Sequence, residues 1–469
     1  MGAVLAIDQG TSQTKAAVVD PERGILAVAE VPVRPVHRSG GRVEQDPIEL
    51  LDSVKAAGYL AATDAGARID MVALANQGEA VLAWDPRTGD PLSTVLLRPD
   101  RRALPICTAL ADHAERVAAI SGLRLEPCFG APKMVWLREH VTTGGVVSTT
   151  DSWLIHRLTG EFVTDAATAS RWLLLDLGKV TWSAELAALF GLEDERLPRL
   201  LGCDEVVGTT RAFGAELPVG GLIPRRQAAL LANGCLLPGQ SWAGYGSGAS
   251  LVANTGVRPA APGRGLTASV AWQARGQTPY CLEGEVHNAG SALDWLARLN
   301  LVDDPTDPEA LPAEDDGVLF VPALSGLGVP WRPGATAAFV GMRLSTRPGH
   351  LAQAVIQGVA AQLAELAREL PVRPEALRVD GAPAASPVLM QIQADLLQLP
   401  LEVSASPHAT VLGTAAYGLL AAHPELTLAD VVPQWRPERR YEPQWPAERA
   451  EEYLARWRRA VETTPDAWE

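Results

Sequence analysis

The sequence is poor in three features that each mark a particular class of protein. Its five cysteines are scattered, with no CxxC or Cys/His spacing, so neither a disulfide framework nor a zinc site is predicted. No apolar run approaches the roughly 20 residues that cross a bilayer, and the run that ends at Asp8 is too short for a signal peptide. Lys and Arg number 40 against 55 Asp and Glu, which gives a net charge of −15. A cytoplasmic protein that binds neither nucleic acid nor a membrane is therefore expected.

The length and the strand pattern predict a two-domain protein of the α/β class. A chain of 469 residues exceeds the size of one ordinary hydrophobic core. Residues 4–20 read as strand, tight turn and strand, and residues 241–256 repeat this order around a second Gly/Ser turn. Two similar hairpins predict two related domains that face each other across a central cleft.

The domain boundaries are predicted where the pattern changes. We expect an N-terminal domain over residues 1–236, a C-terminal domain over 237–424 and a tail over 425–469. Apolar residues at helical spacing predict a long helix over 350–369. The tail is rich in Pro and Trp and ends in an amphipathic helix near 448–462, so we expect it to cap the surface.

The turn of the first hairpin carries residues suited to phosphate binding. Asp8 ends an apolar strand and is followed by small and hydroxyl residues, Gly10, Thr11, Ser12 and Thr14. A carboxylate that holds hydrated Mg²⁺ beside such a turn is one way to bind the terminal phosphates of ATP. The alternative is a plain turn in which Asp8 caps backbone N–H groups.

Two loops in the second half are candidates for the same task. The turn of the second hairpin contains Gly246, Ser247 and Gly248, and a predicted strand ends at Asp380 and Gly381 before a helix. A helix N-terminus that follows a Gly-containing loop favours anions. For both loops an ordinary connecting turn is the alternative interpretation.

Two adjacent arginines stand at the start of a predicted short helix. Arg225 and Arg226 lie in the stretch GLIPRRQAALL (221–231). A helix N-terminus carries partial positive charge, so cations there need an anion nearby. We therefore expect the pair to meet a bound anion or an acidic neighbour, for which Asp100 is the candidate.

Longer motifs follow one another along most of the chain. They are LAIDQGTSQTKAAVVD (5–20), NQGEAVLAWDPRTGDPL (76–92), PDRR (99–102), KMVWLREH (133–140), TDSWLIHRLTGEFVTDAATASR (150–171), YGSGASLVANTG (245–256), LEGEVHNAGSALDWL (282–296), FVPALSGLGVPW (320–331), AAFVGM (337–342) and HLAQAVIQG (350–358). In order and spacing this set resembles the FGGY family of carbohydrate kinases, and within it the glycerol kinases most closely.

The resemblance implies a fold, a reaction and a set of ligands. It implies two actin-like, ribonuclease-H-like domains, with ATP between them and a sugar or polyol deep in the cleft. Mg²⁺ would be held at Asp8, and the nucleotide would contact both hairpins and the loop at Gly381 and Ala382. Closing the cleft would exclude water and align the terminal phosphate with a substrate hydroxyl. The oligomeric state is left open, with a homodimer as one option.

The sequence departs from this family pattern where the chemistry is expected. The family's proton acceptor is the Asp of a G-x-x-x-D-x-Q-A-A-L stretch, and that position is Arg225, which keeps its proton at any working pH. Gln77 and Glu79 remain in a polyol motif whose arginine is Gly78, and the family's substrate-facing Trp is Arg98. These changes disfavour glycerol as the substrate.

Several residues remain candidates for the substrate and nucleotide sites despite these differences from the family pattern. The expected substrate contacts are Gln77, Glu79, Arg98, Asp100, Arg225 and Arg226. Asp100 is the candidate to replace the missing base. In the nucleotide loop the family's second Gly is Ala382, whose Cβ would crowd a backbone that has to approach a phosphate closely.

Two functions fit this pattern. One is an ATP-dependent kinase for an unusual, anionic sugar or polyol, in which the arginines bind the anionic group. The other is a non-catalytic relative that keeps the two-domain clamp to sense a ligand or a partner protein. The fold does not decide between them.

Overall fold

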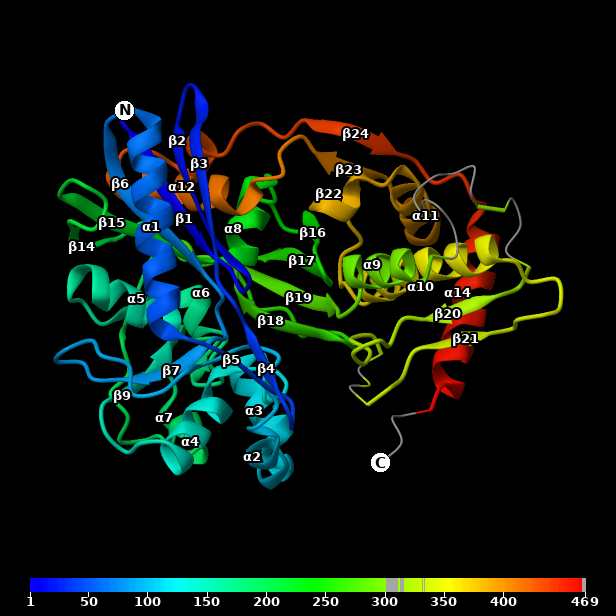
Figure 1. The fold of residues 1–469 in the computed structure, drawn as a ribbon, viewed down its shortest axis with the longest axis horizontal. Coiled ribbons are helices and arrows are strands. Elements are labelled where there is room, and N and C mark those ends of the chain that lie inside the picture. The colour runs from blue at the N-terminus through cyan, green and yellow to red at the C-terminus, as the bar shows by residue number, and fades with distance from the viewer. Residues whose placement is uncertain (301–310, 313–315, 331, 333, 466–469) are drawn as a thin grey trace.

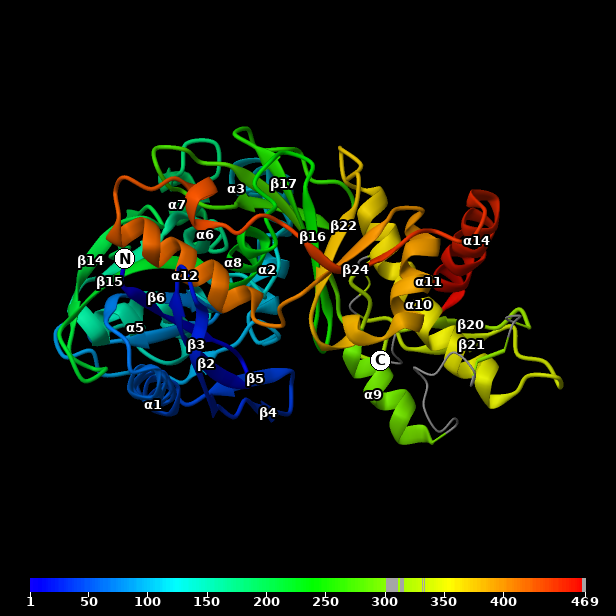
Figure 2. The same ribbon diagram turned by 90° about the horizontal axis from the view of Figure 1, so that it is seen from above.

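Two large β-sheets organise the chain, one in each half. The computed structural model describes residues 1–300, 311–312, 316–330, 332 and 334–465. The sheets lie side by side, with helices packed around each (Figures 1 and 2). This arrangement confirms the predicted α/β class with two domains.

The two sheets share one strand order. The first runs β14 (Val206–Thr210), β15 (Leu217–Pro224), β6 (Ile69–Asn76), β1 (Ala3–Gln9), β2 (Gln13–Asp20) and β3 (Gly24–Pro32). The second runs β18 (Leu266–Val270), β19 (Tyr280–Val286), β17 (Ala249–Gly256), β16 (Ser241–Tyr245), β22 (Leu377–Asp380), β23 (Leu401–Ser404) and β24 (Pro437–Tyr441). In both, an antiparallel hairpin is extended by two parallel strands on one side. On the other side it is extended by antiparallel strands, by β3 in the first sheet and by β19 and β18 in the second. The two predicted hairpins therefore open two copies of one topology.

Smaller sheets and the helices complete the described structure. A five-stranded sheet contains β4 (Val36–Arg38), β5 (Arg42–Gln45), β8 (Val95–Leu96), β7 (Val81–Trp84) and β9 (Val146–Thr149). Three strand pairs are β10 (Val163–Asp165) with β13 (Arg199–Leu201), β11 (Leu175–Asp176) with β12 (Thr181–Trp182), and β20 (Leu319–Val321) with β21 (Ala338–Val340). The helices are α1 (Pro47–Ala65), α2 (Leu104–Ala109), α3 (Ala114–Ser121), α4 (Gly130–His140), α5 (Thr150–Thr159), α6 (Ala166–Ala169), α7 (Ala184–Leu189), α8 (Arg225–Ala232), α9 (Gly290–Leu299), α10 (Pro348–Arg368), α11 (Pro387–Leu397), α12 (Ala409–Ala422), α13 (Leu428–Val431) and α14 (Ala447–Thr463). Within the described part of the chain, no helix has the length and apolarity that a membrane crossing needs.

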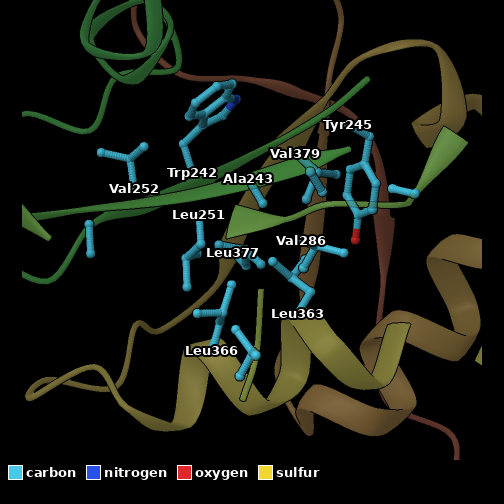
Figure 3. Close-up of a cluster of buried hydrophobic side chains, with 14 of the residues drawn as sticks. Trp242, Ala243, Tyr245, Leu251, Val252, Val286, Leu363, Leu366, Leu377 and Val379 are labelled. Carbon is cyan, nitrogen blue, oxygen red and sulfur yellow. The ribbon is translucent and has the colours of Figure 1, made fainter. Parts of the chain in front are cut away.

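The core of the second domain lies between its sheet and helix α10. Leu251 and Leu377 point from the sheet toward α10, where Leu363 and Leu366 meet them (Figure 3). All four side chains are buried. Strand residues alternate between the two faces of a sheet, so the neighbouring residues of each strand cover the other face.

Helix α12 leaves the second domain and packs on the first sheet, against β1, β6 and β15 (Figure 2). The approach is close: a Cβ on Gly221 would lie 2.6 Å from the backbone nitrogen of Gly418, and Gly221 has φ +66°. Only glycine satisfies both demands without strain. The predicted segment 237–424 is therefore not one packing unit, because its last helix covers the first domain.

The tail is more deeply integrated than a surface cap. Strand β24 pairs antiparallel with β23 and extends the second sheet. Helix α14 packs on α10, α11 and β20. Its Trp457 is fully buried and donates a 3.0 Å hydrogen bond to the Phe320 carbonyl oxygen. The expectation of a cap on the surface is wrong, since this segment completes the second domain.

Candidate functional site

A cavity of about 860 Å³ lies between the two hairpins. Both hairpins line it, together with the start of α8, the loop after β22 and the start of α12. We call the part beside Asp8 and Gly246 the hairpin end, and the part beside Arg98 and Glu285 the floor. The sequence-predicted residues divide between these two regions.

The hairpin end is dominated by a contact between Asp8 and Arg225. Strands β1, β6 and β15 are parallel neighbours, so their carboxyl ends meet at one edge of the sheet. Arg225 Nε lies 2.5 Å from Asp8 Oδ1, and its Nη2 lies 3.1 Å from Oδ2. The negative charge of Asp8 raises the pKa of Arg225 above its usual value. The pair is a bidentate ion pair, which is the strongest geometry for this contact.

The first hairpin presents only part of its predicted set to the cavity. Thr11 lines the cavity and donates to Gln77 Oε1 at 3.1 Å. Thr14 is fully buried, and its hydroxyl lies 2.7 Å from that of Ser53 on α1. Because strand residues alternate, Thr14 faces the core while its neighbours face the cleft. The predicted nucleotide contact of Thr14 is therefore corrected to a core contact.

The other residues of this hairpin also differ in whether they line the cavity. Gly10 lies against the pair: a Cβ there would be 3.5 Å from Arg225 Cζ. Ser12 is exposed and is not part of the cavity wall. Gln13 and Lys15 line the wall although sequence reasoning missed them. Counting alternate residues along the strand from Thr11 would have found both.

The second hairpin is shaped to leave open space. Gly246, Ser247 and Gly248 all line the cavity, and their nucleotide contact stays a prediction. A Cβ on Gly248 would lie 2.5 Å from the Val286 carbonyl oxygen, whereas one on Gly246 would meet nothing nearer than 3.9 Å. The missing side chain at Gly246 thus leaves room at the cavity wall, which suits the phosphate part of a nucleotide.

The loop after β22 contributes two residues to the cavity, Asp380 and Gly381. Gly381 has φ +98°, and a Cβ there would collide with the Tyr245 carbonyl oxygen. Burial raises the pKa of Asp380 to about 6, although Asn233 donates a 3.1 Å hydrogen bond to it. Ala382 is exposed and lies outside the cavity wall, so its predicted nucleotide contact stays a prediction.

Six charged side chains pair across the two domains, and three of them, Arg98, Arg226 and Glu285, line the floor of the cavity. We call this set the interdomain clasp; it consists of Glu79, Arg98, Arg171 and Arg226 from the first domain and Glu283 and Glu285 from β19. Arg171 lies 3.0 Å from Glu79 Oε1 and 3.1 Å from Glu283 Oε1. Arg98 and Arg226 both pair with Glu285. Each arginine of the clasp therefore already has a carboxylate partner.

The electrostatics of the clasp follow from its burial. Burial opposes the charge of Glu79, but Arg171, Arg98 and Arg226 outweigh it and lower its pKa to about 2. Burial lowers the pKa of Lys133 to about 8, and its ammonium donates to the carbonyl oxygens of Glu79 and Cys128, both at 2.7 Å. The floor is thus charged but internally compensated, which is the arrangement that buried ions require.

Asp100 does not take the role predicted for it. It is 1% exposed and receives hydrogen bonds from the Val43 backbone N–H at 2.7 Å and from Arg102 Nε at 2.9 Å. Arg102 holds both of its carboxylate oxygens. The acidic neighbours of the arginine pair are instead Asp8 for Arg225 and Glu283 and Glu285 for Arg226. The expectation of Asp100 as the partner is therefore wrong.

Sequence reasoning named Glu79 but missed the other two carboxylates of the clasp. Glu283 and Glu285 alternate on one strand, in the run LEGEVHNAG, and so share one face of β19. Two acidic residues on one face of a buried strand are unusual and signal a cationic partner. The partners, however, lie far away in the sequence, on first-domain elements.

Comparison with known proteins identifies the family. The model of the N-terminal domain of the FGGY family of carbohydrate kinases matches residues 3–221, and that of its C-terminal domain matches residues 244–422. The chain belongs to the FGGY family. Members of this family are ATP-dependent phosphotransferases, and the resemblance seen in the sequence is thereby confirmed.

Individual relatives agree with this assignment. The chain is 36% identical to a glycerol kinase of Aromatoleum aromaticum and 37% identical to one of Thermus brockianus, each over 98% of both chains. A structure of Plasmodium falciparum glycerol kinase with ADP covers 99% of both chains with a TM-score of 0.90 at 27% identity. A xylulose kinase of Rhodospirillum rubrum covers 98% of both chains with a TM-score of 0.85 at 25% identity. The two-domain kinase fold is thus confirmed over the whole chain.

Proposed function

We propose that this chain is an FGGY-family protein that binds a phosphate-bearing ligand between its domains and has lost efficient phosphoryl transfer. The observation that carries this proposal is the ion pair between Arg225 and Asp8. Arg225 stands where the family resemblance expects the proton acceptor. Its partner is the carboxylate expected to organise the phosphates. Phosphoryl transfer uses both a proton acceptor and a carboxylate that organises the phosphates, and this one contact removes both.

Two of the remaining carboxylates of the cavity, Asp100 and Glu285, are poor replacements for the base, whereas burial raises the pKa of the other two, Asp380 and Glu126. Asp100 is held by Arg102, and Glu285 is paired with Arg98 and Arg226. A carboxylate fixed by a guanidinium is a weak proton acceptor, because the cation stabilises its charged form. Asp380 is held by Asn233 at the opposite side of the hairpin end.

The ligand-binding half of the proposal rests on the hairpin end. Thr11, Gly246, Ser247 and Gly248 line a cavity large enough for a nucleotide, and Gly246 leaves open space at its wall. The phosphates would lie between the two hairpins. A protein with this cleft would respond to its ligand by closing or opening the domains, as a sensor or an interaction protein does.

An assay of ADP release tests the proposal. ATP is supplied with a panel of polyols, sugars and sugar acids, glycerol included, and calorimetry measures ATP binding separately. We expect binding but no ADP release above background. Release of ADP that depends on one acceptor would refute the loss of transfer. Arg225→Asp serves as the matched variant, since a gain of activity there would show that the rest of the site is intact.

A kinase acting on an anionic sugar or polyol is the second candidate. The observation that favours it is a proton acceptor at the floor, His287, which lines the cavity. Burial and the charge of Arg98 lower the pKa of His287 to about 4, so its imidazole is neutral at pH 7 but a weak base. A loose transition state needs little base catalysis, and Arg101, which lines the cavity, could bind the anionic group. If the panel reveals an acceptor, His287→Asn should abolish its turnover.

A further inference from the structure

We propose that the Arg225 guanidinium takes the place of a divalent metal ion, so that the cleft binds the phosphates of a nucleoside triphosphate without Mg²⁺. The proposal rests on the proposed function in one respect, namely that the cleft binds such a ligand. It goes further by assigning the cation that meets the phosphates.

The site does not suit Mg²⁺. Mg²⁺ requires nearly octahedral oxygen ligands at close range, usually including one or two carboxylates. At Asp8 both carboxylate oxygens are hydrogen-bonded to Arg225, and the side chain is 9% exposed. A metal ion there would have to displace the guanidinium and then lie beside its positive charge. Among the residues that the structure describes, no group of three or more His, Cys, Asp or Glu side chains is arranged to hold a metal ion.

The guanidinium is placed to meet phosphates directly. Its side chain is 42% exposed and lines the same cavity as Gly246 and Gly248. A guanidinium carries five N–H groups, and contacts to Asp8 engage its Nε and Nη2. The other N–H groups have no acceptor among the described residues and are left for a ligand. Planar, bidentate donation to phosphate oxygens is the contact that arginine makes best.

The neighbours of Arg225 support the same ligand. Arg225 begins α8, whose eight residues place the positive end of the helix at the cavity wall. Lys15 also lines the cavity, although its ammonium is shared with Glu30 at 2.8 Å. Asp8 and Arg225 together are neutral, whereas Asp8 with Mg²⁺ would carry one positive charge. We therefore expect ATP to bind more weakly than in a metal-loaded site, but independently of the metal.

Calorimetry of the full chain with ATP tests the proposal, once in EDTA and once in excess Mg²⁺. The expected result is a dissociation constant that changes by less than about threefold between the two conditions, because no site contact uses the metal. Weakening by about tenfold or more in EDTA, or no ATP binding in either condition, would overturn the proposal. Inorganic triphosphate as a second probe shows whether the phosphates alone are recognised.

Two variants sharpen the result. Arg225→Gln removes the charge and should weaken ATP binding in EDTA by about tenfold or more. Arg225→Asp should make binding depend on Mg²⁺, since two carboxylates would then face each other. The matched control is Arg116→Gln, which breaks the exposed pair with Glu185 far from the cavity and should leave ATP binding unchanged. Calorimetry measures ATP affinity and not turnover. A dependence of ATP affinity on Mg²⁺ would therefore overturn this proposal without bearing on the ADP-release assay, and release of ADP would refute the loss of transfer without bearing on this proposal.

Discussion

The hairpin end and the floor of the cleft differ in how far their polar and charged groups are already paired. At the hairpin end, backbone and small residues border open space, and the ion pair between Asp8 and Arg225 lies at the wall. At the floor, six side chains of the clasp satisfy one another across the domains. A binding site needs unsatisfied groups, whereas a structural contact needs satisfied ones. The contrast indicates that the hairpin end is the part of the cleft kept for a ligand.

The strongest test of this contrast is Arg171→Leu. The substitution leaves Glu79 and Glu283 buried without their main cation. We expect the free energy of unfolding to fall by about 3–5 kcal/mol, measured by urea denaturation. The exposed control Arg116→Leu should cost about 0–1 kcal/mol. A loss below about 1 kcal/mol for Arg171→Leu would mean that the floor is not held by charge.

A smaller effect is expected for Glu285→Gln, because Arg98 and Arg226 lose the carboxylate that they share and each keeps one longer contact, to Glu79 and to Glu283. The remaining repulsion should destabilise the protein by about 1–3 kcal/mol. Because both arginines come from the first domain and Glu285 from the second, the domains should also separate. Small-angle X-ray scattering would detect this as a larger radius of gyration. The control Glu185→Gln removes an ion pair within one domain and should change neither quantity.

The clasp also predicts how stability depends on pH. The pKa of Glu79 is about 2 in the folded protein and near 4.5 in an unfolded chain. Its ionisation therefore stabilises the fold fully above pH 4.5, and this contribution is lost as the pH falls from about 4.5 to about 2. Glu79→Gln should flatten the pH dependence of the unfolding free energy in this window. An unchanged slope would contradict the assigned charge state.

The smallest expected effect distinguishes two residues of the first hairpin. Thr14→Val removes the buried contact with Ser53 and should cost about 1 kcal/mol of stability without changing ATP affinity. Thr11→Val alters a residue of the cavity wall and should weaken ATP binding while leaving stability nearly unchanged. Thermal unfolding and calorimetry read the two quantities. The reverse outcome would place Thr14, not Thr11, in the site.

Much of the fold could be predicted because it depends on local pattern. Apolar runs on either side of a Gly/Ser turn predicted both hairpins, and helical spacing predicted a helix over 350–369 where α10 spans Pro348–Arg368. What failed was the face on which a strand residue lies, as at Thr14, because that depends on which side the core covers.

The sequence by itself determined the paired hairpins, the long helix over 350–369 and the terminal helix, since each rests on neighbours a few residues apart. The order of the motifs along the chain determined the family. It also marked Arg225 as a residue that requires an anion. Only the tertiary structure decided which anion meets it. Parallel strands bring Asp8 beside Arg225 across 217 residues of chain, and β19 brings Glu285 to Arg98 and Arg226 across the cleft. Charge pairs form wherever the packed sheets bring opposite charges close together. The spacing of residues along the sequence does not give the distance between two side chains that are far apart in the chain.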